Sequence, residues 1–462
     1  MSRSIVVVGA GPAGMAAAME AAARGCRVTV LDEGRFPGGQ VYRQADPDLA
    51  GKEFAEPSEL RRKYSVLERF AKANDSFTYR PGCAVYAVFS NREVHFADGD
   101  HTEIMRPDAV VLATGVREVA IPFPGWTLPG VMFAGGAQSI LKSQRVLPGR
   151  KAVIAGCGPL PLVVAAQLVR AGGDVAALAC LRPPSVMLRH PSALWHGREI
   201  VTEGFKYEAS LLRAGVLRLT GHVPVRALGK DAVEAVVLAR VDQVGNVVTG
   251  TEREIECDLL AVNYGFAANS ELAAMASAPM RRDPVTGWVP IADNYGRTSV
   301  PGIFVAGDSA GLRGALIAES EGTIVGAAAS EALDSDVAPS PQVTDAIQSR
   351  ARYQKFQIAV RESLNVPLAL WKTATPDTTV CRCENVKVCE ILDVLKEGHG
   401  SLNAIKRNVR AGMGWCGGRT CLPSVAALAE LHSSSAEMMT ARPMARPVSF
   451  AALARQQRVE VP

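Results

Sequence analysis

Four cysteines near the C-terminal end of the chain have the types and spacing of a metal-binding set. Cys381 and Cys383 form a C-x-C pair, and Cys416 and Cys421 form a C-x4-C pair after a gap of 32 residues. Four thiolates can bind a [2Fe–2S] cluster or a tetrahedral zinc ion. Because structural zinc sites favour C-x-x-C pairs, this spacing favours the [2Fe–2S] cluster. A zinc site and a module without metal are the alternatives.

The residues around these cysteines suit such a centre. Residues 390–398 and 401–412 are predicted as helices; Gly398 ends the first, and Ser401 is a candidate N-cap for the second. Glycines would let backbone N–H groups approach the sulfurs, and basic side chains would favour the more negative reduced cluster. These residues are Gly412, Gly414, Gly417, Gly418, Lys406, Arg407, Arg410 and Arg419. Cys389 has no partner at a useful spacing, so we expect it on a helix face.

A second set of residues, at the N-terminal end, has the pattern of a dinucleotide site. Gly9, Gly11 and Gly14 form G-x-G-x-x-G between an apolar run and an Ala-rich stretch. The first glycine allows a tight turn, the second lets the backbone approach a pyrophosphate, and the third allows close packing of helix on strand. Free N–H groups at the start of the helix would face the phosphates. Asp32 ends the next predicted strand, where a carboxylate accepts hydrogen bonds from ribose hydroxyls. A purely structural glycine turn is the alternative.

These residues require β-α-β elements to position them. Apolar runs predict strands at 5–8, 28–31 and 109–113, with a helix from the glycine turn to about residue 24. Residues 151–180 repeat the strand, turn, helix and strand. In this second unit Pro161 replaces the third glycine, and no carboxylate ends the second strand; Arg182 alone lies just beyond it. We therefore expect a nucleotide-binding fold in which NAD(P) binding is weak or lost.

Composition excludes several classes of protein. The chain has 462 residues, which suggests about three domains. Its net charge of +4 is too even to indicate nucleic-acid binding, and no apolar stretch predicts a transmembrane segment. Ten cysteines are too few for a secreted disulfide scaffold, and their clustering indicates a reducing compartment. We expect a cytoplasmic protein, with peripheral attachment to the inner membrane as an alternative.

Other candidate residues are weaker. No C-x-x-C or C-x4-C pair precedes Cys381, which argues against a disulfide reductase. Cys26 and Cys83 stand alone and are expected in the core. His190 and His196 are expected at the surface or in packing contacts. The sequence identifies no catalytic residue.

Two further segments resemble flavoproteins of the two-dinucleotide-domain class, such as glutathione and thioredoxin reductases. One segment, VVLATG, ends at Thr114 and Gly115, and the other, GIFVAGD, ends at Gly307 and Asp308. The resemblance implies FAD at the first site, with Asp308 on its ribityl chain. It also implies that the PGGQ segment, with Gly39 and Gln40, passes beside that chain, and that Ala315 and Leu316 face the flavin ring.

The resulting prediction is an α/β chain with two dinucleotide-binding-type (Rossmann-like) domains and a small helical iron–sulfur domain at the C-terminal end. Residues 1–120 and 285–335 would form the FAD-binding domain, and 121–284 an NAD(P)-binding-like domain. Residues 336–375 would form a linker arm and 376–435 the [2Fe–2S] module. The tail, 436–462, is expected to be extended.

The whole chain also resembles one family. The segments CRCENVKVCEI and GMGWCGGRTC resemble the [2Fe–2S] module of bacterioferritin-associated ferredoxin. With the order of domains, and with residues 156–168 and 263–272, they resemble FAD-binding α-type subunits of heteromeric bacterial amine and amino-acid dehydrogenases. That family includes opine (octopine, nopaline) oxidases, D-hydroxyproline dehydrogenase and hydrogen cyanide synthase.

The family resemblance implies an electron-transferring subunit with FAD and a [2Fe–2S] cluster. Its partner would be a flavin-containing β-type subunit that oxidises a C–N bond of an amino acid, imino acid or opine. A small third subunit, FMN at the partner interface and a downstream electron acceptor are further components that the resemblance allows. Two alternatives stay open: a self-sufficient NAD(P)H:acceptor reductase, and a non-catalytic scaffold subunit.

Overall fold

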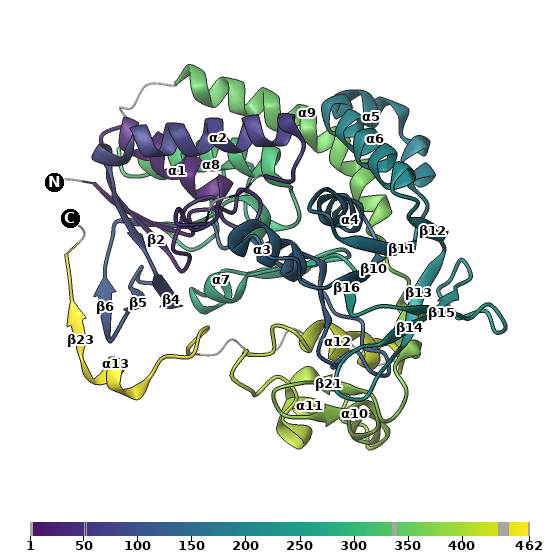
Figure 1. Ribbon diagram of the computed structural model, residues 1–462. Coiled ribbons are helices and arrows are strands. Elements are labelled where there is room, and N and C mark those ends of the chain that lie inside the picture. The colour runs from purple at the N-terminus through teal and green to yellow at the C-terminus, as the bar shows by residue number, and fades with distance from the viewer. Residues whose placement is uncertain (1–2, 50, 52, 335–339, 433–442, 461–462) are drawn as a thin grey trace.

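The computed structural model describes residues 3–49, 51, 53–334, 340–432 and 443–460 (Figure 1). Its first domain is built on a five-stranded parallel sheet in the order β20-β7-β1-β2-β3. The strands are β1 (Ser4–Val8), β2 (Arg27–Asp32), β3 (Thr78–Pro81), β7 (Ala109–Leu112) and β20 (Ile303–Val305). Strands β1 and β7 are buried throughout. Such strands read as unbroken apolar runs because both faces of a parallel sheet are covered.

Helices α1 (Pro12–Ala23) and α8 (Ala315–Glu331) pack on this sheet in close contact with each other. Small residues on both helices allow their backbones to lie close together. A Cβ on Gly322 would lie 2.1 Å from the Ala13 carbonyl oxygen, and one on Gly326 would lie 2.4 Å from that of Ala17. Helix α2 (Pro57–Lys72) covers the same side. A segment of residues 303–331 thus completes a domain that begins at the N-terminal end.

The second domain repeats this plan. Its parallel sheet has the order β12-β11-β10-β16-β9. The strands are β9 (Val131–Phe133), β10 (Lys151–Gly156), β11 (Asp174–Cys180), β12 (Leu217–Thr220) and β16 (Leu259–Asn263). The helices of this domain are α3 (Ala134–Gln144), α4 (Leu160–Arg170), α5 (Pro191–His196) and α6 (Arg198–Arg213). The predicted β-α-β unit at 151–180 is present, with its helix at Leu160–Arg170.

Smaller sheets and turns complete the two domains. An antiparallel sheet contains β4 (Cys83–Val88), β5 (Val94–Asp98) and β6 (His101–Met105), and another contains β13 (His222–Leu228), β14 (Ala235–Arg240) and β15 (Arg253–Glu256). Two strands link the domains: β8 (Val116–Glu118) pairs with β17 (Phe266–Ala268). The remaining elements here are β18 (Met280–Asp283), β19 (Gly287–Pro290), helix α7 (Glu271–Met275) and the 3-10 turns η1 (Asn74–Ser76), η2 (Pro184–Arg189) and η3 (Gly307–Ala310).

A long helix connects the two domains to the cysteine module. This helix, α9 (Pro341–Ser363), runs along both α8 and α5, and the turn η4 (Leu368–Thr373) follows it. The module contains β21 (Thr379–Cys381), β22 (Val386–Lys387), α10 (Val388–Lys396), α11 (Leu402–Val409) and α12 (Leu422–Leu431). Ser401 is confirmed as the N-cap of α11, because its Oγ accepts a hydrogen bond of 3.1 Å from the Ala404 N–H.

The tail returns from the module to the first domain (Figure 1). The sequence predicts an extended tail, whereas the described part contains a short helix, α13 (Phe450–Ala454), and a strand, β23 (Gln456–Arg458). Strand β23 pairs in parallel with β6, and the Val459 N–H donates to the Ile104 carbonyl at 3.0 Å. The tail therefore adds a fourth strand to the small antiparallel sheet. None of the described helices is long and apolar enough to cross a membrane.

Candidate FAD and iron–sulfur sites

The glycine turn after β1 has the geometry of a phosphate-binding loop. Gly9 has φ +102°, and a Cβ there would lie 2.5 Å from the Ala113 carbonyl oxygen. A Cβ on Gly14 would lie 1.8 Å from the Gly9 carbonyl oxygen, so this glycine packs α1 on the turn. A Cβ on Gly11 would have open space around it, and Gly11 lines a large cavity. Gly11 is also the N-cap of α1 and no side chain caps this end, so the helix N-terminus remains available for an anion.

Asp32 lies at the end of β2, where it shapes the same loop. Its Oδ1 accepts a 2.6 Å hydrogen bond from the Gly34 N–H, and its Oδ2 accepts one from the Ala10 N–H. Burial raises the pKa of this carboxyl, while the two backbone N–H groups oppose that shift. Asp32 lines the cavity beside Gly11. A ribose hydroxyl placed there would find an acceptor already fixed by the loop.

The segment with Gly39 and Gln40 lies directly on the glycine turn. A Cβ on Gly39 would lie 2.9 Å from the Gly11 Cα, which leaves room for glycine alone. Both Gly39 and Gln40 line the cavity. Arg43, which the sequence reasoning missed, lines it too, and the Nε of Arg43 is buried with no hydrogen-bond partner in the described structure. An unpaired guanidinium N–H facing a cavity fits an anionic group of a bound cofactor.

Thr114 and Gly115 are held by the strand that returns from the second domain. The Thr114 Oγ1 donates to the Asn269 carbonyl at 2.6 Å, and the Asn269 Nδ2 donates to the Thr114 carbonyl at 2.9 Å. The Asn269 N–H donates to the Gly115 carbonyl at 2.9 Å. Gly115 has φ +67° and open space where a Cβ would be. This turn is therefore rigid, and it leaves space on its cavity side.

The segment at residues 303–316 brings Asp308 to the same cavity. The Asp308 Oδ1 accepts hydrogen bonds of 2.8 and 2.9 Å from the N–H groups of Arg313 and Gly314. Burial raises the pKa of Asp308. Gly307, with φ +67°, packs on α1: a Cβ there would lie 2.7 Å from the Ala13 Cβ. Ala315 and Leu316, at the start of α8, line the cavity with Asp308.

One cavity of about 1770 Å³ joins these segments. Its lining includes Gly9, Gly11, Asp32, Gly39, Gln40, Thr114, Gly115, Asp308, Ala315 and Leu316. A free helix N-terminus, two carboxylates and an unpaired guanidinium N–H are groups that can bind the phosphates and hydroxyls of FAD. The residues present therefore fit this cofactor.

Glu118 is a buried acid in the same cavity that sequence reasoning did not find. Its Oε2 accepts a 2.9 Å hydrogen bond from the Gly135 N–H at the start of α3, and its Oε1 accepts one of 2.7 Å from the Asn263 Nδ2. Burial raises the pKa of Glu118 to about 7, against these two donors. Glu118 therefore joins the linking strand β8 to two elements of the second domain.

The second glycine turn differs from the first. A Cβ on Gly158 would lie 2.4 Å from the Leu364 Cδ2, so a leucine from the end of α9 covers the turn where a pyrophosphate would bind. The Arg182 Nε donates to the Asn365 carbonyl at 3.4 Å. The two residues that follow α9 thus contact the groups available to a dinucleotide. His190, near this site, pairs with Glu362 of α9, as a packing role predicts.

The four cysteines of the module come together in two pairs. The Cys421 thiol and the backbone N–H groups around Cys381 lower the pKa of Cys381 to about 5, and Cys381 raises that of Cys421. Cys383 contacts Cys416, and burial with this neighbour raises the pKa of Cys383. A Cβ on Gly414 would lie 2.2 Å from the Cys383 Cβ. The fold therefore brings the C-x-C motif and the C-x4-C motif, which are 32 residues apart in sequence, into contact with each other.

The grouping of these sulfurs into two contacting pairs bears on which metal they could bind. Around a single zinc ion, thiolates at about 2.3 Å in a tetrahedron lie within about 4 Å of one another. Within the described part of the chain, no three of the four cysteine sulfurs lie within 4.8 Å of one another. Two close pairs set further apart suit two metal ions, each bound by two cysteines. The donor set therefore fits a [2Fe–2S] cluster better than zinc.

The cysteine module is joined to the flavin side by specific contacts. The Arg117 Nε, from the linking strand β8, donates to the Arg419 carbonyl at 2.9 Å. The Trp126 Nε1 donates to the Thr379 carbonyl at 2.6 Å, and the Ser424 Oγ donates to the Ala120 carbonyl at 2.8 Å. These contacts fix the module against the segment that follows Thr114 and Gly115.

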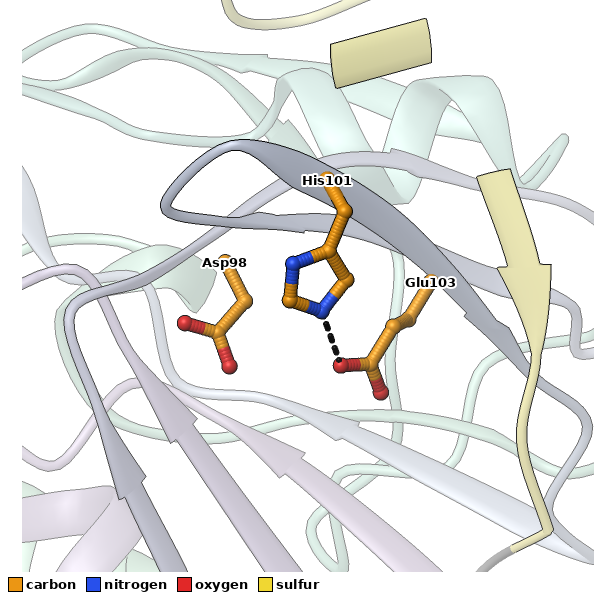
Figure 2. A group of neighbouring side chains, drawn as sticks. All are labelled: Asp98, His101 and Glu103. Atoms are coloured by element: carbon orange, nitrogen blue, oxygen red, sulfur yellow. Dashed lines mark hydrogen bonds and ion pairs between the residues drawn. The ribbon is translucent and has the colours of Figure 1, made fainter. Parts of the chain in front are cut away.

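A group of metal-type side chains outside the cysteine module lies on the small antiparallel sheet (Figure 2). It contains Asp98, His101 and Glu103, with the His101 Nε2 2.9 Å from the Glu103 Oε1. Arg80 pairs with Glu103 at 2.6 Å and with Asp98 at 2.5 Å. Because the guanidinium already balances both carboxylates, we assign no metal to this group.

Comparisons with known proteins agree with this geometry. Residues 3–330 match the family model of pyridine nucleotide-disulphide oxidoreductases, and residues 379–430 match the BFD-like [2Fe-2S] binding domain. An opine oxidase subunit of Rhizobium meliloti is 33% identical over 471 residues, which cover 97% of this chain and 87% of that protein. The hydrogen cyanide synthase subunit HcnB of Pseudomonas aeruginosa is 32% identical over 430 residues, which cover 90% of each chain.

Among solved structures, L-proline dehydrogenase from P. horikoshii has the same fold. The TM-score is 0.71 at 22% sequence identity, over 98% of this chain and 80% of that chain. The predicted fold class and family are confirmed. The matches to both family models assign FAD and a [2Fe–2S] cluster as the cofactors of this chain. The chain is an FAD-dependent oxidoreductase, and it belongs to the pyridine nucleotide-disulphide oxidoreductase family, in the group with a BFD-like [2Fe–2S] domain that includes HcnB and the matching opine oxidase subunits.

Proposed function

We propose that the chain is the FAD and [2Fe–2S] electron-transfer subunit of a heteromeric dehydrogenase or oxidase. The enzyme would act on a C–N bond of an amino acid, imino acid or opine, such as D-hydroxyproline, octopine or nopaline. Relatives named as subunits of opine oxidase and hydrogen cyanide synthase support this proposal. A flavin accepts a hydride and releases single electrons, which a one-electron cluster requires.

The observation that carries the proposal is that one cavity is lined both by the proposed FAD-binding residues and by residues next to the proposed cluster cysteines. Thr114 and Asp308 line it at the flavin site, and Arg382, Arg419 and Thr420 of the cysteine module line it as well. Arg382 follows one cluster cysteine directly, and Thr420 precedes another. Electrons passing between the FAD and the cluster would therefore cross a short, continuous region of this chain.

The electron source in this proposal is a flavin-containing β-type subunit. Leu364 covers the second glycine turn, which argues against direct reduction by NAD(P)H. The cysteine module also presents an apolar surface suited to a partner: the Trp415 side chain is 77% exposed and that of Met413 is 40% exposed. Trp415 is adjacent to Cys416, so a partner on this surface would lie close to the cluster.

The experiment compares the chain alone with the complex purified from its native source. The complex should reduce a dye when the amino-acid or opine substrate is added, and the isolated chain should show little or none of this activity. In the complex, replacing any one of Cys381, Cys383, Cys416 and Cys421 with serine should remove the cluster absorbance and most dye reduction while leaving FAD bound. Cys389→Ser is the matched control and should change neither.

Two results would contradict the proposal. Substantial substrate-dependent dye reduction by the isolated chain would place the substrate site here. One zinc ion per chain, with no iron, would remove the electron-transfer role of the module.

A further inference from the structure

The cavity continues from the flavin site into the second domain, where its lining is apolar. Side chains from three elements form this apolar lobe: Met187 and Leu188 of η2, Leu194 of α5, and Ile200, Val201 and Phe205 of α6. Helix α9 lines both the lobe and the flavin region, with Phe356, Val360 and Gln357. A cavity of about 1770 Å³ exceeds the roughly 300–1,000 Å³ of most single ligand sites. It therefore has room for a second ligand beside FAD.

The polar groups of the lobe are already used by the protein. Leu364 lies against Gly158 at the glycine turn, and Arg182 donates to the Asn365 carbonyl. Arg218 pairs with Glu208, with the Nη2 2.9 Å from the Oε1. A dinucleotide entering the lobe would have to displace Leu364 and find other partners for its phosphates. The lining therefore suits a ligand whose surface is mainly apolar.

A glycine within α6 opens space in this lobe. A side chain at Gly204 would meet no atom within 4 Å, and Gly204 lines the cavity beside Phe205. Glycine inside a helix lowers stability relative to alanine. No neighbouring atom would clash with a larger side chain at this position, so packing within the protein does not require the glycine. The glycine leaves space in the cavity that a ligand can occupy.

The mouth of the lobe is apolar and lies in a basic region. Leu188 and Phe205 line the cavity although their side chains are 65% and 68% exposed. Arg189 and Lys206, the residues next to them in sequence, are exposed, and each also faces a carboxylate: Arg189 Nη1 lies 3.1 Å from Glu362 Oε1, and Lys206 Nζ lies 3.9 Å from Glu56 Oε2. The segment 182–218 has six basic and three acidic residues. Figure 1 places α5 and α6 at the edge of the molecule, beside α9. An exposed apolar mouth with basic neighbours is complementary to an anionic bilayer surface.

We propose that the apolar lobe binds a lipid-soluble quinone, which enters from an anionic bilayer through the mouth at Leu188 and Phe205 and accepts electrons from the flavin. In this reaction the reduced flavin would give two electrons and two protons to the quinone, which would become a quinol. This inference rests on the flavin role in the proposed function and adds the class of terminal acceptor.

The first test measures binding of decylubiquinone to the oxidised, FAD-loaded chain by equilibrium dialysis in mild detergent. Phe205→Glu and Leu188→Glu should each weaken binding roughly tenfold, because a carboxylate at the mouth disfavours an apolar ligand. Leu212→Glu is the matched control: Leu212 lies on the same face of α6, two turns further on, and is 69% exposed, but it does not belong to the described cavity lining. Its affinity should stay within about twofold of the unchanged chain.

The second test follows reoxidation of photoreduced flavin by decylubiquinone without oxygen, and the same ranking of variants is expected. The unchanged chain should also co-sediment with phosphatidylglycerol-containing vesicles, and Phe205→Glu should reduce this. Absence of quinone binding to the unchanged chain, or equal losses in Leu212→Glu and Phe205→Glu in detergent, would overturn the lobe assignment. Absence of vesicle binding would overturn entry from the bilayer. Neither test uses the partner subunit or the amino-acid substrate, so their failure is distinct from failure of the proposed function.

Discussion

Asp32 and Asp308 are the two carboxylates proposed to bind FAD, and each can be tested by a single substitution. Each accepts two backbone N–H groups and lines the cavity. A hydrogen bond to a charged group contributes about 1.5–3 kcal/mol, so Asp32→Ala and Asp308→Ala should each weaken FAD binding roughly 10- to 150-fold. Flavin content after dialysis and titration of the apoprotein measure this. Asp345→Ala, exposed on α9, is the control. Unchanged affinity in both cavity variants would show that FAD binds elsewhere.

Glu118 makes stability depend on pH in a direction opposite to that of most paired carboxylates. Its folded pKa of about 7 lies above its ordinary value of 4.5, so the folded state holds a proton that the unfolded state has lost. Unfolding free energy should therefore fall as pH rises from 4.5 to 7, by about 3 kcal/mol from this group.

Urea unfolding at pH 5 and pH 8 tests this, with Glu118→Gln beside the unchanged chain. The glutamine cannot ionise, so its stability should fall less between the two pH values. Glu254→Gln, exposed on β15, should keep the full dependence. Equal pH dependence in all three chains would mean that Glu118 stays charged in the folded state.

At the scale of elements, the tail contributes to the wall of the cavity that is proposed to hold FAD. Ala445 and Arg446 line that cavity, the Arg446 Nη2 lies 2.5 Å from the Glu33 Oε2, and the Arg419 Nη2 donates to the Ala445 carbonyl. Strand β23 anchors this segment on β6. Release of the strand should therefore loosen the cover over the cofactor.

Val459→Pro should release that strand, because proline has no N–H to donate to the Ile104 carbonyl. We expect FAD to dissociate several-fold faster, measured as recovery of flavin fluorescence after dilution, and the tail to be cut sooner by protease. Val459→Ala keeps the N–H and should behave like the unchanged chain. An unchanged FAD dissociation rate in Val459→Pro would show that the tail does not cover the cofactor.

The elements that could be predicted from sequence are those with long apolar periodicity. The β-α-β units around Gly9 and Gly158 were predictable because buried parallel strands are unbroken apolar runs between glycine turns. Strand β23 was not, since its residues Gln456–Arg458 are exposed and carry no pattern. Residues 456–458 form a strand because they pair with β6, which lies more than 350 residues earlier in the sequence.

The same distinction applies to the site. Gly11, Asp32 and the four cysteines have recognisable spacing, so the sequence alone selects them as candidates. Arg43, Glu118 and Leu364 belong to no recognisable sequence pattern. Each reaches the cavity only through contacts that form when the chain folds. Leu364 reaches Gly158 only after α9 has crossed both domains, and no local pattern indicates that contact.

At the scale of the whole molecule, the position of Leu364 after α9 predicts which electron donors the protein can use. With Leu364 over the second glycine turn, NADH should leave the FAD absorbance unchanged for minutes after anaerobic mixing. Dithionite, which needs no binding site, should bleach the same sample at once and serves as the control. Rapid bleaching by NADH would establish direct entry of electrons from a nicotinamide and would favour a self-sufficient reductase.

The position of β20 and α8 sets the order in which a ribosome can produce a working flavin site. Strands β1, β2 and β7 are made early, but β20, Asp308 and α8 lie in residues 303–331. At about 5–20 residues per second, roughly 15–55 s separate synthesis of β2 from that of β20. The second domain is complete by then, so it can fold first while the first sheet waits without its edge strand. The apolar face that α8 will cover stays open during that interval, and the nascent chain should depend on chaperones most strongly before residue 331 emerges.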